Sequence, residues 1–422
     1  HPAWAPCRVS GVAPENSLID IPAAQFELGR DRKAPLVYGW DNEFGQHEVS
    51  TAAFQASRHL VTNHEFLAFV EAGGYADDSL WPEEGAAWKK FAQAEHPTFW
   101  IRDGAQWRLR LMLEEVPMPW NWPVETNYHE AKAFCNWKAR SSGQAVRLPS
   151  EDEWQALRRF AGIDDLATRL PANIGLAQEA SSCPVDRFAH GPLFDVVGNV
   201  WQWQETPIYP LAGFEVHPIY DDFTTPTFDE RHNLIKGGSW ISCGNEAAPI
   251  SRYAFRRHFF QHAGFRYVVA DAAATQPASH YETDRLISEY IEFHYGDEYF
   301  GVPNFPRALA QLAIATMGGR PAHKALDLGC ATGRATFELA RHFDQVTGID
   351  FSARFIGVGT QLAEQGWLRY TLTEEGELVS YKECSLSTLG LAEMAPKVEF
   401  FQGDACNLKP VFAGYDLILA AN

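Results

Sequence analysis

The spacing of apolar residues along the chain changes near residue 270. Up to that point, short apolar runs are separated by turns rich in Gly, Pro and Asn, and helical periodicity is confined to a few segments. From about residue 280 onward, helical segments alternate with strand-like apolar runs. Residues 271–280, in between, are small and polar and include a proline, which is the composition of a linker. The pattern predicts two domains, over residues 1–270 and 281–422, with a linker over 271–280.

Three helices of the first region are predicted from their caps. A segment over residues 62–73 begins with a capping Thr and ends at glycine, and residues 127–143 begin with a capping Asn and also end at glycine. Ser150 and Glu153 have the spacing of a capping box, which predicts the third helix. Because these helices are embedded in loop-rich and Trp-rich sequence, we expect an irregular α+β fold held together by aromatic packing.

Composition and charge narrow the classes of function. Hydrophobic residues make up 46% of the chain and charged residues 21%, so the chain can bury extensive cores. The net charge of −19 would repel a phosphate backbone, which excludes nucleic acid as an expected partner. No run of 18 uncharged apolar residues exists, so no membrane partner is expected either.

The cysteines and the first residues bear on the compartment. The seven cysteines are scattered and form neither a CxxC pair nor a zinc-ligand spacing. Residues 1–7 lack the basic and apolar regions of a signal peptide. We therefore expect buried thiols and a cytoplasmic location.

The second region contains a glycine-rich turn between a strand and a helix. Gly329 and Gly333 follow an apolar run over 324–328, and they allow the backbone to turn tightly and a ligand to approach closely. About twenty residues later a second strand ends at Asp350, a spacing that suits a carboxylate accepting both hydroxyls of a ribose. From these residues alone, a dinucleotide site and a related fold without a working site both stay open.

Two further strands are predicted over 398–401 and 415–419, and Gly403-Asp404 follow the first of them. Together with Asp327, which precedes the first glycine, this set resembles the class I S-adenosylmethionine-dependent methyltransferases, which have a Rossmann-like α/β fold. Ala331 stands where that family commonly has a glycine. Because the family needs about seven strands and four are predicted, we expect the methyltransferase domain to be truncated at its C-terminus.

The resemblance to methyltransferases implies S-adenosylmethionine as a cofactor. It also implies which part of the cofactor each motif would contact. Asp327, Gly329 and Gly333 would face the methionine moiety. Asp350 would bind the ribose, and Asp404 would bind the amino group of the adenine.

The Trp-rich first region resembles the formylglycine-generating-enzyme (sulfatase-modifying factor) fold, which is related to C-type lectins. Five segments carry the resemblance in the order of that family: 123–137, 147–154, 195–203, 237–240 and 264–266. They imply a loop-rich α+β domain. Formylglycine-generating enzymes bind copper through a cysteine pair shortly before the closing Gly-Phe-Arg, whereas residues 251–262 contain no cysteine. We therefore do not expect that activity.

Residues 39–43, Gly-Trp-Asp-Asn-Glu, resemble a segment of the non-haem iron sulfoxide synthases of thiohistidine biosynthesis. Residues 236–247 and 281–296 resemble the branch with a fused methyltransferase, the 5-histidylcysteine sulfoxide (ovothiol) synthases. This resemblance implies Fe(II)- and oxygen-dependent joining of cysteine to histidine, followed by N-methylation of the thiohistidine. Two alternatives are an ergothioneine-type synthase that acts on trimethylhistidine, and a non-catalytic lectin-like binding module fused to a methyltransferase.

The family holds its iron with three histidines of an N-terminal helical domain. We therefore expect the iron ligands to lie outside this chain, which would be a fragment of a longer protein, and we expect no metal ligand within it. Two local pairs, His59 with His64 and His258 with His262, have no convergent carboxylate, so packing and hydrogen bonding are their expected roles.

Five residues of the first region are candidates for the sulfoxide chemistry. Tyr209 matches a tyrosine close to the oxygen chemistry, where a phenol can donate a hydrogen bond and a proton. Arg252 and Arg256, spaced four apart, are candidates for binding substrate carboxylates. Asn245 and Glu246 are candidates for binding an amino group or an imidazole. The alternatives are a packed loop tyrosine and structural salt bridges.

Overall fold

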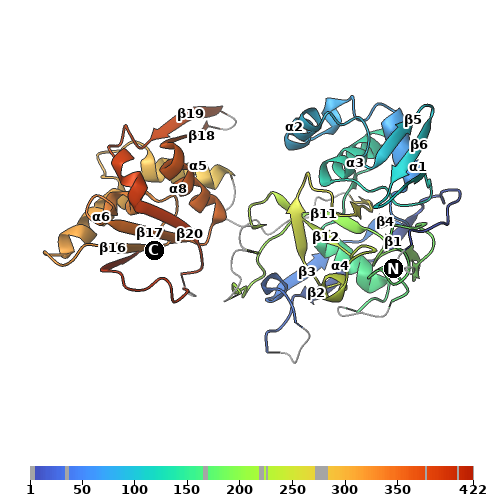
Figure 1. Ribbon diagram of the computed structural model, residues 1–422, viewed down its shortest axis with the longest axis horizontal. Helices are drawn as coiled ribbons and strands as arrows, with labels where there is room; N and C mark the ends of the chain where they lie inside the picture. The colour runs from blue at the N-terminus through green and yellow to red at the C-terminus, as the bar shows by residue number, and fades with distance from the viewer. Residues whose placement is uncertain are drawn as a thin grey trace. The chain divides into compact units, whose positions relative to one another are not determined.

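The computed structural model of the chain describes residues 5–33, 38–164, 170–217, 223–224, 227–270, 284–375, 378–405 and 408–421. The chain divides into two compact units, which are drawn in Figure 1. The first comprises His1–Phe214 and Arg231–Gln276, and the second comprises Glu215–Glu230 and Pro277–Asn422. The linker predicted over 271–280 lies outside the described residues.

The three helices predicted in the first unit are confirmed. They are α1 (Asn63–Glu71), α3 (Tyr128–Ser142) and α4 (Glu151–Phe160), and α2 (Glu83–Ala92) is a further helix. The hydroxyl of Thr62 accepts the main-chain N–H of Glu65 in the first turn of α1, and both Asn127 and Ser150 form complete capping boxes with the glutamate three residues later. Short polar side chains therefore set the point at which each helix begins.

The strands of the first unit form several small sheets. They are β1 (Leu18–Ile21), β2 (Ala24–Leu28), β3 (His47–Thr51), β4 (Phe54–Ser57), β5 (Trp100–Asp103), β6 (Gln106–Arg110), β7 (Glu115–Pro117), β8 (Val146–Arg147), β9 (Ala189–His190), β10 (Leu193–Phe194), β11 (Trp201–Pro207), β12 (His232–Lys236), β13 (Tyr253–Arg256), β14 (Ala263–Gly264) and β15 (Val268–Val269). One sheet has the order β1-β4-β15-β8 and is antiparallel. A second has the order β13-β12-β11-β14, in which β11 and β14 run parallel.

Aromatic side chains form the core of the first unit. Phe66 of α1 stacks on Phe134 of α3 with ring centroids 5.5 Å apart, and both rings pack edge-on against Phe265. Trp203 of β11 is fully buried and donates its indole N–H to the main-chain oxygen of Thr126 at 3.0 Å. The expected aromatic packing is therefore what joins the helices to the short strands.

The second unit contains a parallel sheet whose four strands match the four predicted ones. These strands are β16 (Lys324–Leu328), β17 (Gln345–Asp350), β20 (Val398–Gln402) and β21 (Leu417–Ala420). Their order is β20-β17-β16-β21, and all neighbours are parallel (Figure 1). The order changes direction at β16, and ligands of such sheets bind beyond the carboxyl ends of the strands at that point.

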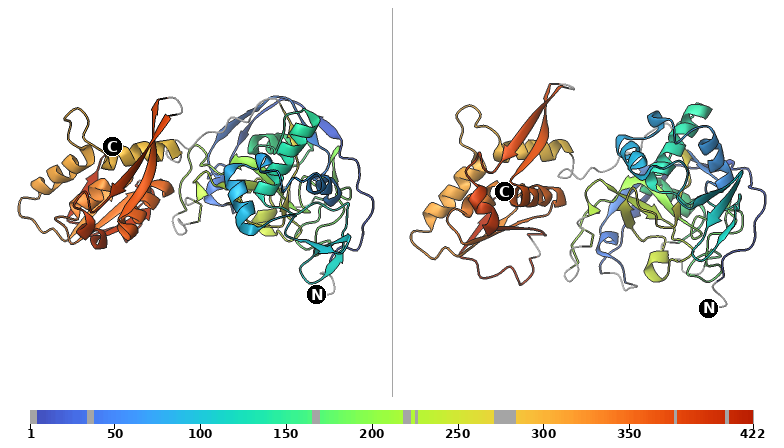
Figure 2. Two further views of the ribbon diagram at one scale, coloured as in Figure 1. Left: turned by 90° about the horizontal axis from the view of Figure 1, so that it is seen from above. Right: turned by 45° about the horizontal axis from the view of Figure 1, so that its top comes forward.

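Helices and one hairpin complete the second unit. The helices are α5 (Asp284–Tyr295), α6 (Phe305–Thr316), α7 (Arg334–Leu339) and α8 (Ala353–Gln365). The hairpin of β18 (Trp367–Glu375) and β19 (Leu378–Ser385) was not predicted, and it projects from the parallel sheet (Figure 2). It is tied to α5 because the carboxylate of Glu292 accepts hydrogen bonds from Tyr370 at 2.5 Å and from Lys382 at 2.7 Å.

Within the described part of the chain, no helix combines the length and the apolar character that a membrane span requires.

Candidate functional site

A cavity of about 590 Å³ lies at the carboxyl ends of the parallel strands of the second unit. Four of the five residues predicted to bind a cofactor line it: Asp327 near the end of β16, Gly329 directly after that strand, Asp350 at the end of β17, and Asp404 after β20. Gly333, the fifth, begins α7 and is not part of the lining. The structure therefore brings the three carboxylates, which are far apart in sequence, to one hollow.

The glycine-rich turn between β16 and α7 needs its glycines for two different reasons. Gly333 has a φ of +89°, and a Cβ there would lie 2.6 Å from the ring of Phe400. Gly329 has a φ of +72° and lines the cavity, with open space where a Cβ would stand. Ala331 also has a positive φ, +45°, which explains why glycine suits this position in methyltransferases.

The Asp350 carboxylate holds this turn in place. Its Oδ2 accepts the N–H of Ala331 at 2.8 Å, and its Oδ1 accepts the N–H of Ser352 at 2.9 Å. Burial raises the pKa of Asp350 above its usual value, although these backbone donors oppose the shift. Each carboxylate oxygen keeps a further lone pair, so the residue can accept hydroxyl groups of a ligand as well.

Asp327 is the most deeply buried acid of the cavity. Its Oδ2 accepts the hydroxyl of Thr336 at 2.7 Å. Burial is the main reason that the pKa of Asp327 rises from 3.8 to about 6, and the nearby charge of Asp350 adds to the shift. No Lys or Arg belongs to the described lining of the cavity. A cationic ligand would therefore supply the positive charge that the lining does not offer to the Asp327 carboxylate.

Helices α5 and α6 supply an apolar wall that was not predicted. Tyr290, Phe293 and His294 of α5 and Phe305 and Leu309 of α6 line the cavity. Phe293 and His294 follow Tyr290 by three and four residues, so all three lie toward one side of α5, and this helical spacing is the signal from which the wall could have been found.

Two contacts hold α5 over the cavity. The hydroxyl of Tyr295 donates to the main-chain oxygen of Thr332 at 2.6 Å, which ties the end of α5 to the glycine-rich turn. The ring of Tyr290 lies 4.5 Å from that of Phe355 in α8.

The candidates Tyr209 and Arg252 of the first unit lie in a buried ionic cluster. Glu151 is fully buried and accepts two hydrogen bonds from Arg252 at 2.9 Å, and its Oε1 lies 2.8 Å from Nζ of the buried Lys236. The guanidinium of Arg252 lies 4.8 Å from the ring centre of Tyr209 and donates to the main-chain oxygens of Tyr209 and Asn42. Every guanidinium nitrogen of Arg252 thus has a partner in the chain.

The buried position changes the chemistry that Tyr209 can perform. Burial and then the charge of Glu151 raise the pKa of the Tyr209 hydroxyl, so the neutral phenol is the stable form. His47 packs edge-on against its ring, and Nε2 of His47 lies 3.2 Å from a carboxylate oxygen of Asp152. The role of Tyr209 near oxygen chemistry stays a prediction.

The remaining candidates of the first unit do not converge. Arg256 is exposed at the end of β13, whereas Arg252 is buried just before that strand. Four residues span about 13 Å in an extended strand, so their spacing does not give two adjacent guanidinium groups. Asn245 donates to the main-chain oxygen of Tyr38 at 2.8 Å, and Glu246 is exposed. Their roles in substrate binding also stay predictions.

The histidine pairs have individual partners instead of a common site. Nδ1 of His59 lies 3.1 Å from the main-chain oxygen of Val185, and Nδ1 of His262 lies 2.9 Å from a carboxylate oxygen of Glu125. His258 is exposed. Among the described residues, no three His, Cys, Asp or Glu side chains are grouped so that they could hold a metal ion.

The two units correspond to two known classes of domain. Residues 9–271 match the family model of the sulfatase-modifying factor enzyme 1-like domain, and the chain belongs to this family. Residues 325–383 match that of a methyltransferase domain. The fold is therefore a loop-rich α+β domain of the formylglycine-generating-enzyme type followed by a class I methyltransferase-type α/β domain, as the resemblances implied.

Among individual proteins, the chain is similar to hercynine oxygenase of Mycolicibacterium thermoresistibile, with 32% identity over 250 residues, 55% of this chain and 52% of the relative. It is 24% identical to ergothioneine biosynthesis protein 1 of Schizosaccharomyces pombe, over 54% of this chain and 26% of the relative. It is 30% identical to the formylglycine-generating enzyme of Mycobacterium tuberculosis, over 60% of this chain and 97% of the relative. The chain thus spans about half the length of the hercynine oxygenase.

Proposed function

We propose that the chain is part of an ovothiol-type enzyme, which joins cysteine to histidine with Fe(II) and oxygen and then N-methylates the thiohistidine with S-adenosylmethionine. The observation that carries the methyltransferase half is the cavity in which Asp327, Asp350 and Asp404 meet. The sulfoxide-synthase half is supported by the similarity of the first unit to hercynine oxygenases. The iron ligands of the proposed enzyme are expected outside this chain.

The residues around the cavity suit S-adenosylmethionine. Gly329 leaves open space in the lining, and the acids offer acceptors to the groups that the cofactor presents. Asp350 would accept the ribose hydroxyls, Asp404 the adenine amino group, and Asp327 would face the cationic methionine moiety. When bound, S-adenosylmethionine supplies a methyl group on a positively charged sulfur.

The chain's own contribution to methyl transfer is mainly alignment. A neutral imidazole nitrogen is already a nucleophile, so the domain needs to hold it in line with the methyl group and needs little base catalysis. The apolar side chains of α5 and α6 border the cavity and reduce the access of water to it. The buried carboxylates provide a fixed negative environment for the cationic methyl donor.

Calorimetric binding of S-adenosylhomocysteine, the demethylated cofactor, tests the methyltransferase half. In Asp350→Asn, the loss of a charged acceptor should weaken binding about 10- to 100-fold. Asp344→Asn is a matched control, because Asp344 is exposed and stands just before β17, at the end opposite Asp350. If the unaltered chain does not bind S-adenosylhomocysteine at millimolar concentration, this half of the proposal is wrong.

An ergothioneine-type synthase is the second candidate, and the similarity to hercynine oxygenases favours it. The fused methyltransferase domain favours the ovothiol type. Turnover of histidine and of trimethylhistidine by the full-length protein, with mass spectrometry of the sulfoxide products, distinguishes the two. Preferential turnover of trimethylhistidine would reject the ovothiol type.

A further inference from the structure

His294 is a buried residue of the cavity to which the motifs gave no individual role. It lies in the last turn of α5 with 6% of its surface exposed, and it lines the cavity. Its neighbour Tyr295 is bonded to the glycine-rich turn, so His294 stands over that turn. Tyr290, one helical turn earlier, packs on Phe355, which follows the ribose-binding candidate Asp350.

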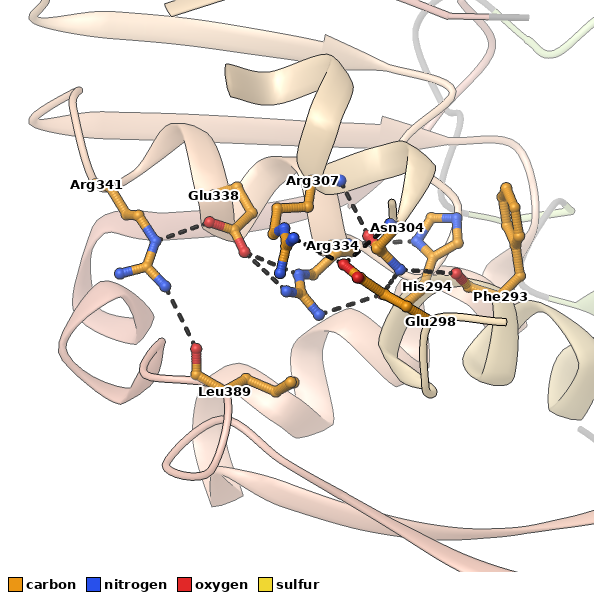
Figure 3. A network of polar contacts seen from close by, with 9 residues as sticks. All are labelled: Phe293, His294, Glu298, Asn304, Arg307, Arg334, Glu338, Arg341 and Leu389. Atoms are coloured by element: carbon orange, nitrogen blue, oxygen red, sulfur yellow. Dashed lines mark hydrogen bonds and ion pairs between the residues drawn. The ribbon is translucent and has the colours of Figure 1, made fainter. Parts of the chain in front are cut away.

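A network of polar contacts fixes the main chain of His294 (Figure 3). Its main-chain oxygen accepts from the Asn304 side chain at 3.0 Å and from Nη1 of Arg334 at 3.3 Å. Glu338 accepts from Nε of Arg334 at 3.0 Å and from Arg341 at 2.7 Å. The guanidinium of Arg334 is therefore committed to this network, and it does not belong to the cavity lining.

A hydrogen bond to Nδ1 of the imidazole ring defines its tautomer. Nδ1 accepts the main-chain N–H of Arg334 at 3.4 Å, so it carries no proton. Burial and the neighbouring charge of Arg334 lower the pKa of His294 to about 3, so the ring is neutral near pH 7. A neutral ring with an accepting Nδ1 must carry its proton on Nε2. In the described part of the chain, no residue hydrogen-bonds Nε2, which points away from the network in Figure 3.

The three acids of the cavity cannot bind one group of the proposed cofactor, its α-carboxylate. The ribose hydroxyls, the adenine amino group, the sulfonium and the ammonium are donors or cations, and the three acids can receive them. The α-carboxylate needs a donor instead, and the described lining contains no Lys or Arg. Of the other lining side chains with a polar hydrogen, Cys330 donates its thiol to the main-chain oxygen of Ala331, and the ring of Tyr290 packs on Phe355. Ser352, whose hydroxyl accepts the N–H of Phe355, stands on the ribose side because its own N–H is held by Asp350.

We infer that His294 binds the α-carboxylate of the methionine moiety by donating its Nε2–H to it. This inference rests on the proposed function, because it assumes that S-adenosylmethionine occupies the cavity. The site would thereby bind a carboxylate with a neutral donor, which adds no cation beside the positively charged methyl donor. An amino-acid acceptor also has an α-carboxylate, so the test has to identify which carboxylate His294 contacts.

Two ligands and two variants of the full chain test the inference by calorimetry. S-adenosylhomocysteine has the α-carboxylate, whereas 5′-methylthioadenosine lacks the whole amino-acid group. His294→Ala should weaken binding of S-adenosylhomocysteine about 10- to 100-fold, because a hydrogen bond to a charged group is lost. It should change binding of 5′-methylthioadenosine by less than about twofold, within the usual scatter of distant substitutions.

His294→Gln is the conservative variant, because its amide nitrogen can donate close to the position of Nε2. It should bind S-adenosylhomocysteine within about fivefold of the unaltered chain, since the donor is kept. His323→Ala, a change of an exposed histidine on the same unit, should bind both ligands as the unaltered chain does.

The outcomes separate the inference from the proposed function. If the unaltered chain binds neither ligand, the proposed function fails. If it binds both and His294→Ala binds S-adenosylhomocysteine normally, the proposed function stands and the inference is overturned. Equal losses for both ligands in His294→Gln would also overturn it, because His294 would then support the cavity without contacting the carboxylate.

Discussion

Glu151 in the first unit and Asp327 in the second are both buried carboxylates, but they have different partners. Glu151 has Arg252 and Lys236 beside it, and although burial alone would raise its pKa, these two cations lower it to about 2. Asp327 accepts hydrogen bonds from Thr336 but has no Lys or Arg beside it in the described lining of the cavity, and burial raises its pKa to about 6. A buried acid with cations of its own chain supports the fold, whereas one without them suits a cationic ligand.

The two carboxylates also have opposite effects on stability as the pH changes. The pKa of Glu151 is lowered, so its contribution is present above pH 4.5 and is lost as the pH falls through about 2. The pKa of Asp327 is raised, so the folded state is favoured below pH 3.8 and loses on the order of 3 kcal/mol as the pH rises through about 6. Binding of a cation to Asp327 would restore that free energy, which couples the second unit to its ligand.

The largest expected effect is that of Glu151→Gln. Removing the negative charge leaves Arg252 and Lys236 buried without a counter-ion, which should lower the free energy of unfolding of the first unit by about 3–5 kcal/mol. Denaturant unfolding followed by Trp fluorescence measures this unit, because every Trp except Trp367 lies before residue 271.

The control for Glu151→Gln is Glu114→Gln, which breaks the exposed pair of Glu114 with Arg8 and should leave the unfolding midpoint unchanged. An unchanged midpoint in Glu151→Gln itself would show that the ionic cluster is not what holds the fold around Tyr209.

Gly333→Ala is expected to have an intermediate effect, on the second unit. A Cβ at this position must adopt a left-handed backbone and displace the ring of Phe400, at a cost of about 1–3 kcal/mol. Hydrogen exchange by mass spectrometry should show faster exchange in α7 and β16. Gly414 has a similar φ, +80°, but open space where a Cβ would stand. Gly414→Ala therefore measures the cost of the left-handed backbone without a steric clash. Equal exchange in the two variants would show that contact with Phe400 is unimportant.

The features that could be predicted from the sequence also differ between the two units. The strands β16, β17, β20 and β21 were predictable because each is a short apolar run, and a parallel order places Asp327, Asp350 and Asp404 at one edge. The caps of α1, α3 and α4 were predictable because capping is local.

Contacts between distant segments were not predictable. The spacing of Arg252 and Arg256 predicts a carboxylate-binding role, which stays a prediction, whereas the contact of Arg252 with Glu151, 101 residues away, has no local signal. The hairpin β18–β19 depends on Glu292, which is 78 residues from Tyr370. The donor role of His294 depends on a hydrogen bond from Arg334, 40 residues along the chain. A local sequence pattern does not indicate which residues so far apart along the chain will be in contact.

The smallest expected effect is a release of protons from Asp327 when a ligand binds. In the free protein Asp327 is about half protonated near pH 6. An ammonium group beside it would lower its pKa, so S-adenosylhomocysteine should release roughly 0.3–0.5 protons at pH 6 and almost none at pH 8. The affinity should therefore rise as the pH increases through 6. Calorimetry in buffers that differ in ionisation enthalpy measures the number of protons.

Asp327→Asn should remove most of this release, and 5′-methylthioadenosine, which has no ammonium group, should cause little of it in the unaltered chain. Asp350 has a raised pKa as well, so it is the competing source of a proton. A release that is the same with both ligands would assign the proton to the ribose side of the cavity. Asp327 would then be buried without a cationic partner both in the free protein and in the complex. Its burial would in that case not serve the binding of a cationic ligand.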